Sequence, residues 1–156
     1  MVDNILAAFI SMDSENESVY TANAQTLVSQ FQQLDQSLQT ELANCLLDEV
    51  IVSHDAYGYL ARRYGFTMHA IGGLSTNDEP SAKILADLKE EAKEGITHIL
   101  TEENSVRRFA ETLAAETGHT ILPINPLGQG TLDPNKDFFD IMNENLSSLK
   151  TALNCN

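Results

Sequence analysis

Three polar residues follow short apolar runs in this sequence, at the points where strands of a sheet would end. They are His54, Glu102 and Asn125. Imidazole nitrogens and carboxylate oxygens are common zinc ligands, and the same groups serve as general acids and bases. These positions are therefore the first candidates for chemistry, whether metal binding or proton transfer.

Only one of the four histidines ends a predicted strand. His54 follows the first apolar run, His69 lies inside the second, and His98 and His119 lie at or before the start of later ones. The two ends of strands of this length are about 15 Å apart, so His98 and His119 belong to the opposite edge of a sheet. A single histidine at a strand end also commonly acts as a hydrogen-bonding residue. Position alone leaves His54 open between that role and metal ligation.

The acidic and amide residues near His54 also have competing roles. Glu102 and its neighbour Glu103 are favoured as negative charges at the start of the next helix, where the helix dipole stabilises them. The alternatives for Glu102 and Glu103 are direct metal ligation or a contact with a ligand side chain. The second of these roles is also open to Asn125 and Asp55.

The sequence lacks the common motifs of catalytic and phosphate-binding sites. It has no G-x-S-x-G, no Walker motif and no H-E-x-x-H. Ser53 and His54 are adjacent, and adjacent side chains at a strand end point apart, so they do not form a nucleophile–base pair. Tyr57 and Tyr59 are expected to pack. We therefore expect a binding protein and not an enzyme.

The charge balance narrows the choice of partners. The 156 residues include 23 acidic and 9 basic ones, for a formal net charge of −14. Nucleic acids and anionic membranes are disfavoured, because binding them needs clustered Lys and Arg. A cationic ligand suits the charge, although an acidic surface is also an ordinary means of staying in solution. No apolar stretch is long enough to predict a membrane span.

Four apolar runs alternate with amphipathic segments after two leading helices. The predicted strands are residues 49–53, 66–72, 97–101 and 120–124. The predicted helices are residues 2–10, 20–47, 55–64, 80–95, 106–117 and 133–153. This alternation predicts an α/β fold, a four-stranded parallel sheet with flanking helices and right-handed crossovers. Pro123 predicts that the fourth strand lies at an edge. Such sheets bind ligands beyond the carboxyl ends of their strands, where His54 is expected.

Two cysteines, Cys45 and Cys155, are far apart in the sequence and have no metal-binding spacing. In an oxidising compartment they would form a disulfide that closes a long loop. Two unpaired helix cysteines fit the sequence equally well, and the sequence leaves both alternatives open.

Several motifs resemble, in order, those of the zinc and manganese solute-binding proteins of ABC transporters. The most specific is Ile51-Val-Ser-His54-Asp55-Ala-Tyr57-Gly-Tyr-Leu-Ala-Arg-Arg-Tyr-Gly65, which resembles the "HDAfgYfarryG" signature of that family. Five further segments fall in register, and they are residues 20–24, 73–81, 99–102, 114–118 and 126–128. The resemblance covers nearly the whole chain.

The resemblance implies an architecture of two (β/α)4 lobes joined by a long helix, with the metal between the lobes. This chain resembles only the C-terminal lobe. Residues 1–12 correspond to the C-terminal end of the linking helix, and residues 13–156 to the lobe itself. The N-terminal lobe, with its own ligands, is expected as the missing partner.

The resemblance also assigns roles to particular residues. His54 falls on the metal-ligand position of the C-terminal lobe, where zinc-type members carry His and manganese-type members carry Glu. Zinc is therefore the expected ion and manganese the alternative. Asn125 stands where many members have an acidic ligand, which favours a three-histidine site. Glu102 matches a family position in a supporting role.

As a member of that family, the chain would deliver zinc to an ABC permease in a periplasmic or extracytoplasmic location. Its first residues lack the basic start of a signal peptide. Two alternatives remain, a manganese-specific or adhesin-type member and a stand-alone flavodoxin-like interaction module. The flavodoxin-like alternative lacks the phosphate-binding glycines or acidic cluster expected after the first strand.

Overall fold

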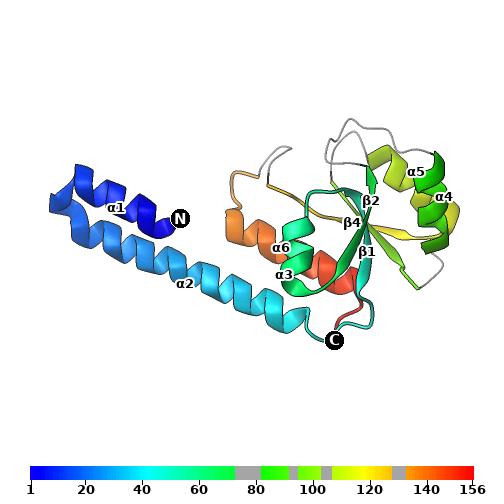
Figure 1. Cartoon of the computed structure of the whole chain (residues 1–156), viewed down its shortest axis with the longest axis horizontal. Helices are drawn as coiled ribbons and strands as arrows, with labels where there is room; N and C mark the ends of the chain where they lie inside the picture. The colour runs from blue at the N-terminus through cyan, green and yellow to red at the C-terminus, as the bar shows by residue number, and fades with distance from the viewer. Residues whose placement is uncertain (73–81, 92–94, 103–106, 128–132) are drawn as a thin grey trace. The chain divides into compact units, whose positions relative to one another are not determined.

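A computed structural model describes residues 1–72, 82–91, 95–102, 107–127 and 133–156 (Figure 1). The chain divides into two compact units, Met1–Ser37 and Leu38–Asn156. In the described residues, no helix is long and apolar enough to cross a membrane. The predicted helix start at Pro80, the motif at residues 73–81, Glu103 and Gly128 lie outside the described residues.

The first unit is helical. Helix α1, Val2–Met12, is followed by a single 3-10 turn, η1, at Ser14–Asn16, and then by α2, Glu17–Glu41, which continues into the second unit. Asp13 Oδ2 fixes the turn between them, because it accepts hydrogen bonds from Asn16 Nδ2 at 2.8 Å and Tyr20 Oη at 2.7 Å. Both hydrogen bonds lower the pKa of Asp13, and the one from Asn16 has the larger effect. The predicted first helix is confirmed.

The second unit holds a four-stranded sheet. Its strands are β1 Glu49–His54, β2 Thr67–Gly72, β3 His98–Thr101 and β4 Thr120–Pro123. All pairs are parallel, and the strand order is β2-β1-β3-β4. The predicted parallel sheet is confirmed, and so is the edge position of the strand that contains Pro123. Strand β1 lies inside the sheet, and its residues Val50, Ile51 and Val52 are fully buried. A run of β-branched residues is typical of a strand that is covered on both faces.

Four helices cover the two faces of this sheet. They are α3 Gly58–Tyr64, α4 Ala82–Glu91, α5 Arg107–Thr117 and α6 Phe138–Ala152. Helices α4 and α5 lie on one side of the sheet, and α3 and α6 lie on the other (Figure 1). Under α4 and α5, Leu88 and Leu113 pack into one buried cluster with Ile51, Ile71 and Ile99 of the sheet.

The starts of α3 and α6 differ from the sequence prediction. The last helix was expected to begin at Asp133-Pro134, but α6 begins at Phe138 because Asp137 and Asp140 form a capping box there. Asp133 instead accepts a hydrogen bond from the backbone N–H of Asn135 at 2.9 Å, which holds a separate turn. Helix α3 begins at Gly58 rather than residue 55, and it ends as predicted at Gly65, whose φ of 82° suits glycine.

The long helix α2 ends at Glu41 and not at residue 47, because the next residues pair with the C-terminus. Cys45 and Cys155 form an antiparallel bridge and a disulfide, which resolves the alternatives that the sequence left open. The backbone N–H groups of Leu46 and Leu47 donate to the carbonyls of Asn154 and Leu153 at 3.2 and 3.0 Å. The C-terminal segment is thereby attached beside the start of β1.

Candidate metal site at the carboxyl edge of the sheet

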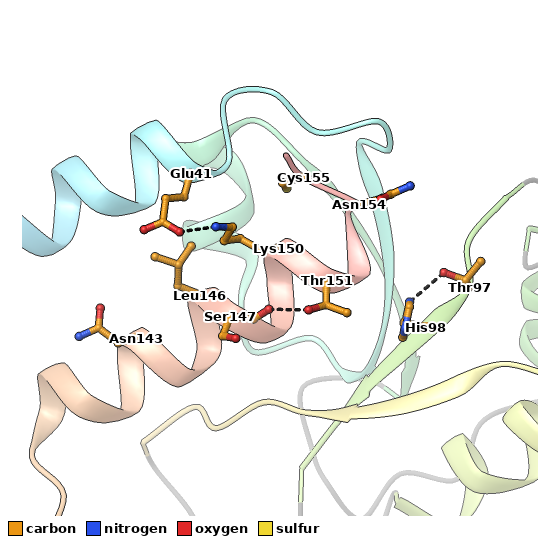
Figure 2. A pocket seen from close by; sticks show the side chains of 10 residues that line it. All are labelled: Glu41, Thr97, His98, Asn143, Leu146, Ser147, Lys150, Thr151, Asn154 and Cys155. Atoms are coloured by element: carbon orange, nitrogen blue, oxygen red, sulfur yellow. Dashed lines mark hydrogen bonds and ion pairs between the residues drawn. The ribbon is translucent and has the colours of Figure 1, made fainter.

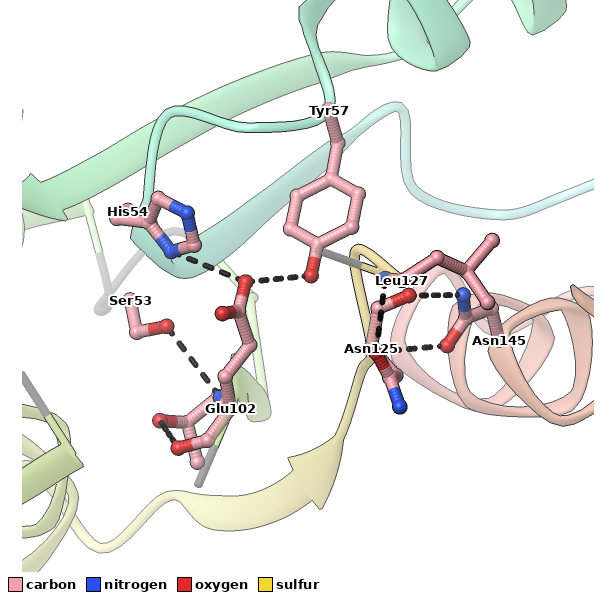
Figure 3. A network of polar contacts seen from close by, with 8 residues as sticks. Ser53, His54, Tyr57, Glu102, Asn125, Leu127 and Asn145 are labelled. Carbon is pink, nitrogen blue, oxygen red and sulfur yellow. Dashed lines mark hydrogen bonds and ion pairs between the residues drawn. The ribbon is translucent and has the colours of Figure 1, made fainter. Parts of the chain in front are cut away.

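His54 and Glu102 meet because they extend neighbouring strands to the same level. Strands β1 and β3 pair with Val52 opposite Leu100, so the residues two positions further on are also opposite each other. His54 is the last residue of β1, and Glu102 follows the end of β3. Both side chains come together at the carboxyl edge of the sheet (Figure 3).

The contact between them is close and buried. Nδ1 of His54 lies 3.0 Å from Oε1 of Glu102, and each residue is 5% exposed. The pair is at ion-pair distance, although the N–H is not aligned for a regular hydrogen bond to any acceptor among the described residues. A buried imidazole N–H needs an acceptor, and the carboxylate is within reach. With the proton on Nδ1, Nε2 keeps its lone pair, which is the form that binds a metal.

Two further groups hold Glu102 in place. Its backbone N–H donates to Oγ of the fully buried Ser53 at 3.4 Å. Its Oε1 accepts a hydrogen bond from the hydroxyl of Tyr57 at 2.6 Å (Figure 3). Burial and the nearby carboxylate raise the pKa of Tyr57, so the phenol stays protonated and donates. Tyr57 was expected only to pack, and its contact with Glu102 was missed.

Asn125 is engaged in local structure. Its side-chain Oδ1 accepts the N–H of Leu127 at 2.8 Å, which forms a turn. The buried carboxamide of Asn145 in α6 makes two hydrogen bonds to the backbone of Asn125. Its oxygen accepts from the N–H of Asn125 at 2.8 Å, and its nitrogen donates to the carbonyl of Asn125 at 2.7 Å. The role of Asn145 was not predicted from the sequence. The available signal was an amide on the apolar face of α6, in line with Met142 and Leu149.

The remaining candidates lie apart from this contact. Asp55 is exposed in the turn after β1. His69 lies in β2, where its Nε2 is 3.4 Å from Oε2 of Glu49. Within the described ranges, no three His, Cys, Asp or Glu side chains gather to hold a metal. The described residues of this edge therefore place a carboxylate beside His54, and among them there is no complete ligand set.

The other two histidines lie at the opposite edge, as predicted. His98 begins β3, and its register partner Thr120 follows His119. Nδ1 of His98 is 2.8 Å from Oγ1 of Thr97, and Nδ1 of His119 is 2.6 Å from Oγ1 of Thr117. Burial lowers the pKa of His98, and the charge of the nearby His119 lowers it further.

A polar cavity of about 650 Å³ opens at this opposite edge (Figure 2). His98 lines it, and so do Glu41 and Lys150, whose side chains form an ion pair at 2.6 Å. The ammonium group already neutralises the carboxylate there. This cavity lies at the other edge of the sheet from His54, and the donor chemistry favours the carboxyl edge as the metal site.

Comparisons with known proteins identify the family of the chain. The family model described as "Zinc-uptake complex component A periplasmic" matches residues 1–152. The high-affinity zinc uptake system protein ZnuA of Bacillus subtilis is 36% identical over 156 residues, and the match covers 97% of this chain and 49% of that protein. The chain therefore spans about half the length of this curated relative.

Solved structures of similar proteins share the fold. The Zn(II)-bound E280Q variant of AdcAII from Streptococcus pneumoniae has a TM-score of 0.81 at 30% identity, and the match covers 97% of this chain and 55% of that one. The laminin-binding protein Lmb of Streptococcus agalactiae, described as a bifunctional protein with adhesin and metal transporting activity, has a TM-score of 0.85 at 26% identity. That match covers 96% of this chain and 58% of Lmb.

Proposed function

The chain belongs to the family of periplasmic zinc-uptake components, and from this premise we propose that it is one lobe of a solute-binding protein that captures zinc for an ABC permease. In this proposal His54 is the zinc ligand of the lobe, and the other ligands come from a second lobe. Residues 1–12 belong to the helix that links the two. The family is one of transport components, so the proposed role is capture without catalysis.

The observation that carries the proposal is the buried contact between His54 and Glu102. A metal-binding histidine typically donates its other ring N–H to a carboxylate, and Nδ1 of His54 lies 3.0 Å from such a group. A neutral imidazole suits zinc well, which supports zinc over manganese. The disulfide between Cys45 and Cys155 supports an oxidising, extracytoplasmic location.

The experiment is a calorimetric titration of zinc and manganese into the whole two-lobed protein. We expect His54→Ala to weaken zinc binding by more than the roughly 10–100-fold that loss of a supporting contact costs, because a direct ligand is removed. His98→Ala is the matched control, since His98 lies at the opposite edge of the sheet. Unchanged zinc affinity in His54→Ala, or a larger effect in His98→Ala, would contradict the assignment.

The same titration on this chain alone tests the idea of a shared site. The described residues of the carboxyl edge supply one histidine and no cluster of three ligands, so we expect only weak zinc binding. Tight binding at one zinc per chain would show that the lobe needs no partner.

Adhesion is a second candidate function, favoured by the likeness to Lmb. A laminin-binding assay with the whole protein separates the two roles. Saturable laminin binding that His54→Ala leaves intact would support a separate adhesive surface.

A further inference from the structure

One oxygen of Glu102 is approached from two sides. Oε1 lies 3.0 Å from Nδ1 of His54 and accepts a hydrogen bond of 2.6 Å from the hydroxyl of Tyr57. The three residues are between 5% and 7% exposed, so water does not replace either contact easily. Figure 3 shows the imidazole and the phenol on either side of the carboxylate.

The backbone keeps Tyr57 close to His54. The N–H of Ala56 donates to the carbonyl of His54 at 3.0 Å, which closes a tight turn directly after β1. Tyr57 then precedes the first residue of α3, and its carbonyl accepts the N–H of Ala61 at 2.9 Å. The turn and the helix thus set the phenol and the imidazole, three residues apart, against the same carboxylate.

The hydrogen bond from Tyr57 is the better aligned of these two contacts to Oε1. The Glu102 side chain has several rotatable bonds, and its contact with Nδ1 of His54 is not aligned as a regular hydrogen bond. The hydroxyl of Tyr57 donates to the same oxygen at 2.6 Å, an ordinary length for an O–H···O hydrogen bond. Loss of this hydroxyl would remove a contact that orients Oε1 toward Nδ1.

We propose that Tyr57 is a positioning residue, whose hydroxyl holds Oε1 of Glu102 against Nδ1 of His54. The imidazole is thereby kept in the tautomer with its proton on Nδ1, and Nε2 is left as the donor to a metal ion. The tautomer follows from the three side chains alone. The link to zinc rests on the proposed function.

The test reads the tautomer of His54 directly in the metal-free, 15N-labelled chain. Long-range 1H–15N correlation spectra distinguish the two neutral tautomers, and they are recorded near pH 8, above the ordinary histidine pKa of about 6.5. His54→Gln identifies the His54 signals. We expect the Nδ1–H form in the wild type, and a mixture shifted toward Nε2–H in Tyr57→Phe.

The chain offers matched controls. Tyr59→Phe removes a hydroxyl two residues away from a side chain that is 87% exposed, and we expect its His54 signals to match the wild type. The signals of His69, His98 and His119 report in the same spectra whether the fold is intact. An Nε2–H form of His54 in the wild type would overturn the proposal without any variant. An unchanged Nδ1–H form in folded Tyr57→Phe would also overturn it.

Zinc titration of the whole protein tests the second part. We expect Tyr57→Phe to weaken zinc binding about 10–100-fold, as loss of an outer contact to a ligand does. A changed tautomer with unchanged zinc affinity would overturn the link to the metal. If His54→Ala itself left zinc affinity unchanged, the proposed function would fail, while the tautomer result would still decide the role of Tyr57.

Discussion

At the scale of single residues, Glu102 gives His54 a fixed direction. The carboxylate is buried between Nδ1 of His54 and the hydroxyl of Tyr57, and its backbone is held by Ser53. A ligand that is held before the ion arrives loses less conformational freedom on binding. If His54 is the zinc ligand that we propose, the zinc affinity should therefore also depend on Glu102, which lies against its other ring nitrogen.

We expect Glu102→Gln to weaken zinc binding by the whole protein about 10–100-fold, because the amide keeps the shape but loses the charge that favours the Nδ1–H form. Calorimetry measures the change. Glu116→Gln serves as control, because Glu116 is exposed on α5. If Glu102→Gln and the wild type bound zinc with equal affinity, Glu102 would have no role in zinc binding.

The sequence singled out His54 and Glu102 as candidates, but it did not predict the contacts of Tyr57 and Asn145. The first two stand at strand ends, and a parallel sheet brings such positions to one edge whatever the details of packing. The hydroxyl of Tyr57 meets a partner 45 positions away in the sequence, and Asn145 meets one 20 positions away. Residue type and periodicity carry no information about such specific contacts.

At the scale of elements, α6 holds the loop that follows β4. The carboxamide of Asn145 binds both the N–H and the carbonyl of Asn125, much as a neighbouring strand would. Asn145 is 4% exposed and Asn125 is half-buried, so removal of the amide would take the partner from two backbone groups in a place with limited access to water.

We expect Asn145→Ala to lower the free energy of unfolding by about 1–3 kcal/mol, since it leaves buried backbone groups unsatisfied. Asn143→Ala, an exposed position two residues earlier on the same helix, should change it by less than about 0.5 kcal/mol. Urea unfolding followed by circular dichroism measures both. Similar values for the two variants would mean that the contacts of Asn145 contribute little.

The strands were predicted more accurately than the helix ends. Apolar, β-branched runs define the strands almost to the residue, and Pro123 marks an edge. The start of α6 was misplaced because Asp133 and Asp137 are both acceptable caps by type. The choice between them depends on which aspartate finds a partner such as Asp140, and the full three-dimensional path of the chain decides that.

At the scale of the whole chain, the disulfide closes the second unit. Cys45 and Cys155 are 110 positions apart, so the bond encloses nearly all of that unit. Such a cross-link mainly restricts the unfolded chain, and its effect grows with the length of the loop. Loop length alone left pairing undecided in the sequence, because pairing also requires the two chain segments to meet.

We expect replacement of both cysteines by alanine to lower the free energy of unfolding by about 2–5 kcal/mol. Reducing the wild type with dithiothreitol should give the same loss, while the double variant should be insensitive to the reductant. Urea unfolding with and without reductant makes the comparison. A wild type that is unaffected by full reduction would show that the bridge adds no stability.

The central claim is that Nε2 of His54 binds the captured zinc ion. A crystal structure of the zinc-loaded whole protein, with anomalous data collected at the zinc edge, tests it most directly. We expect an anomalous peak roughly 2.0–2.1 Å from Nε2 of His54, with Glu102 still against Nδ1. A zinc peak that His54 does not contact, or one bound to Nδ1, would contradict both the ligand assignment and the role given to Glu102.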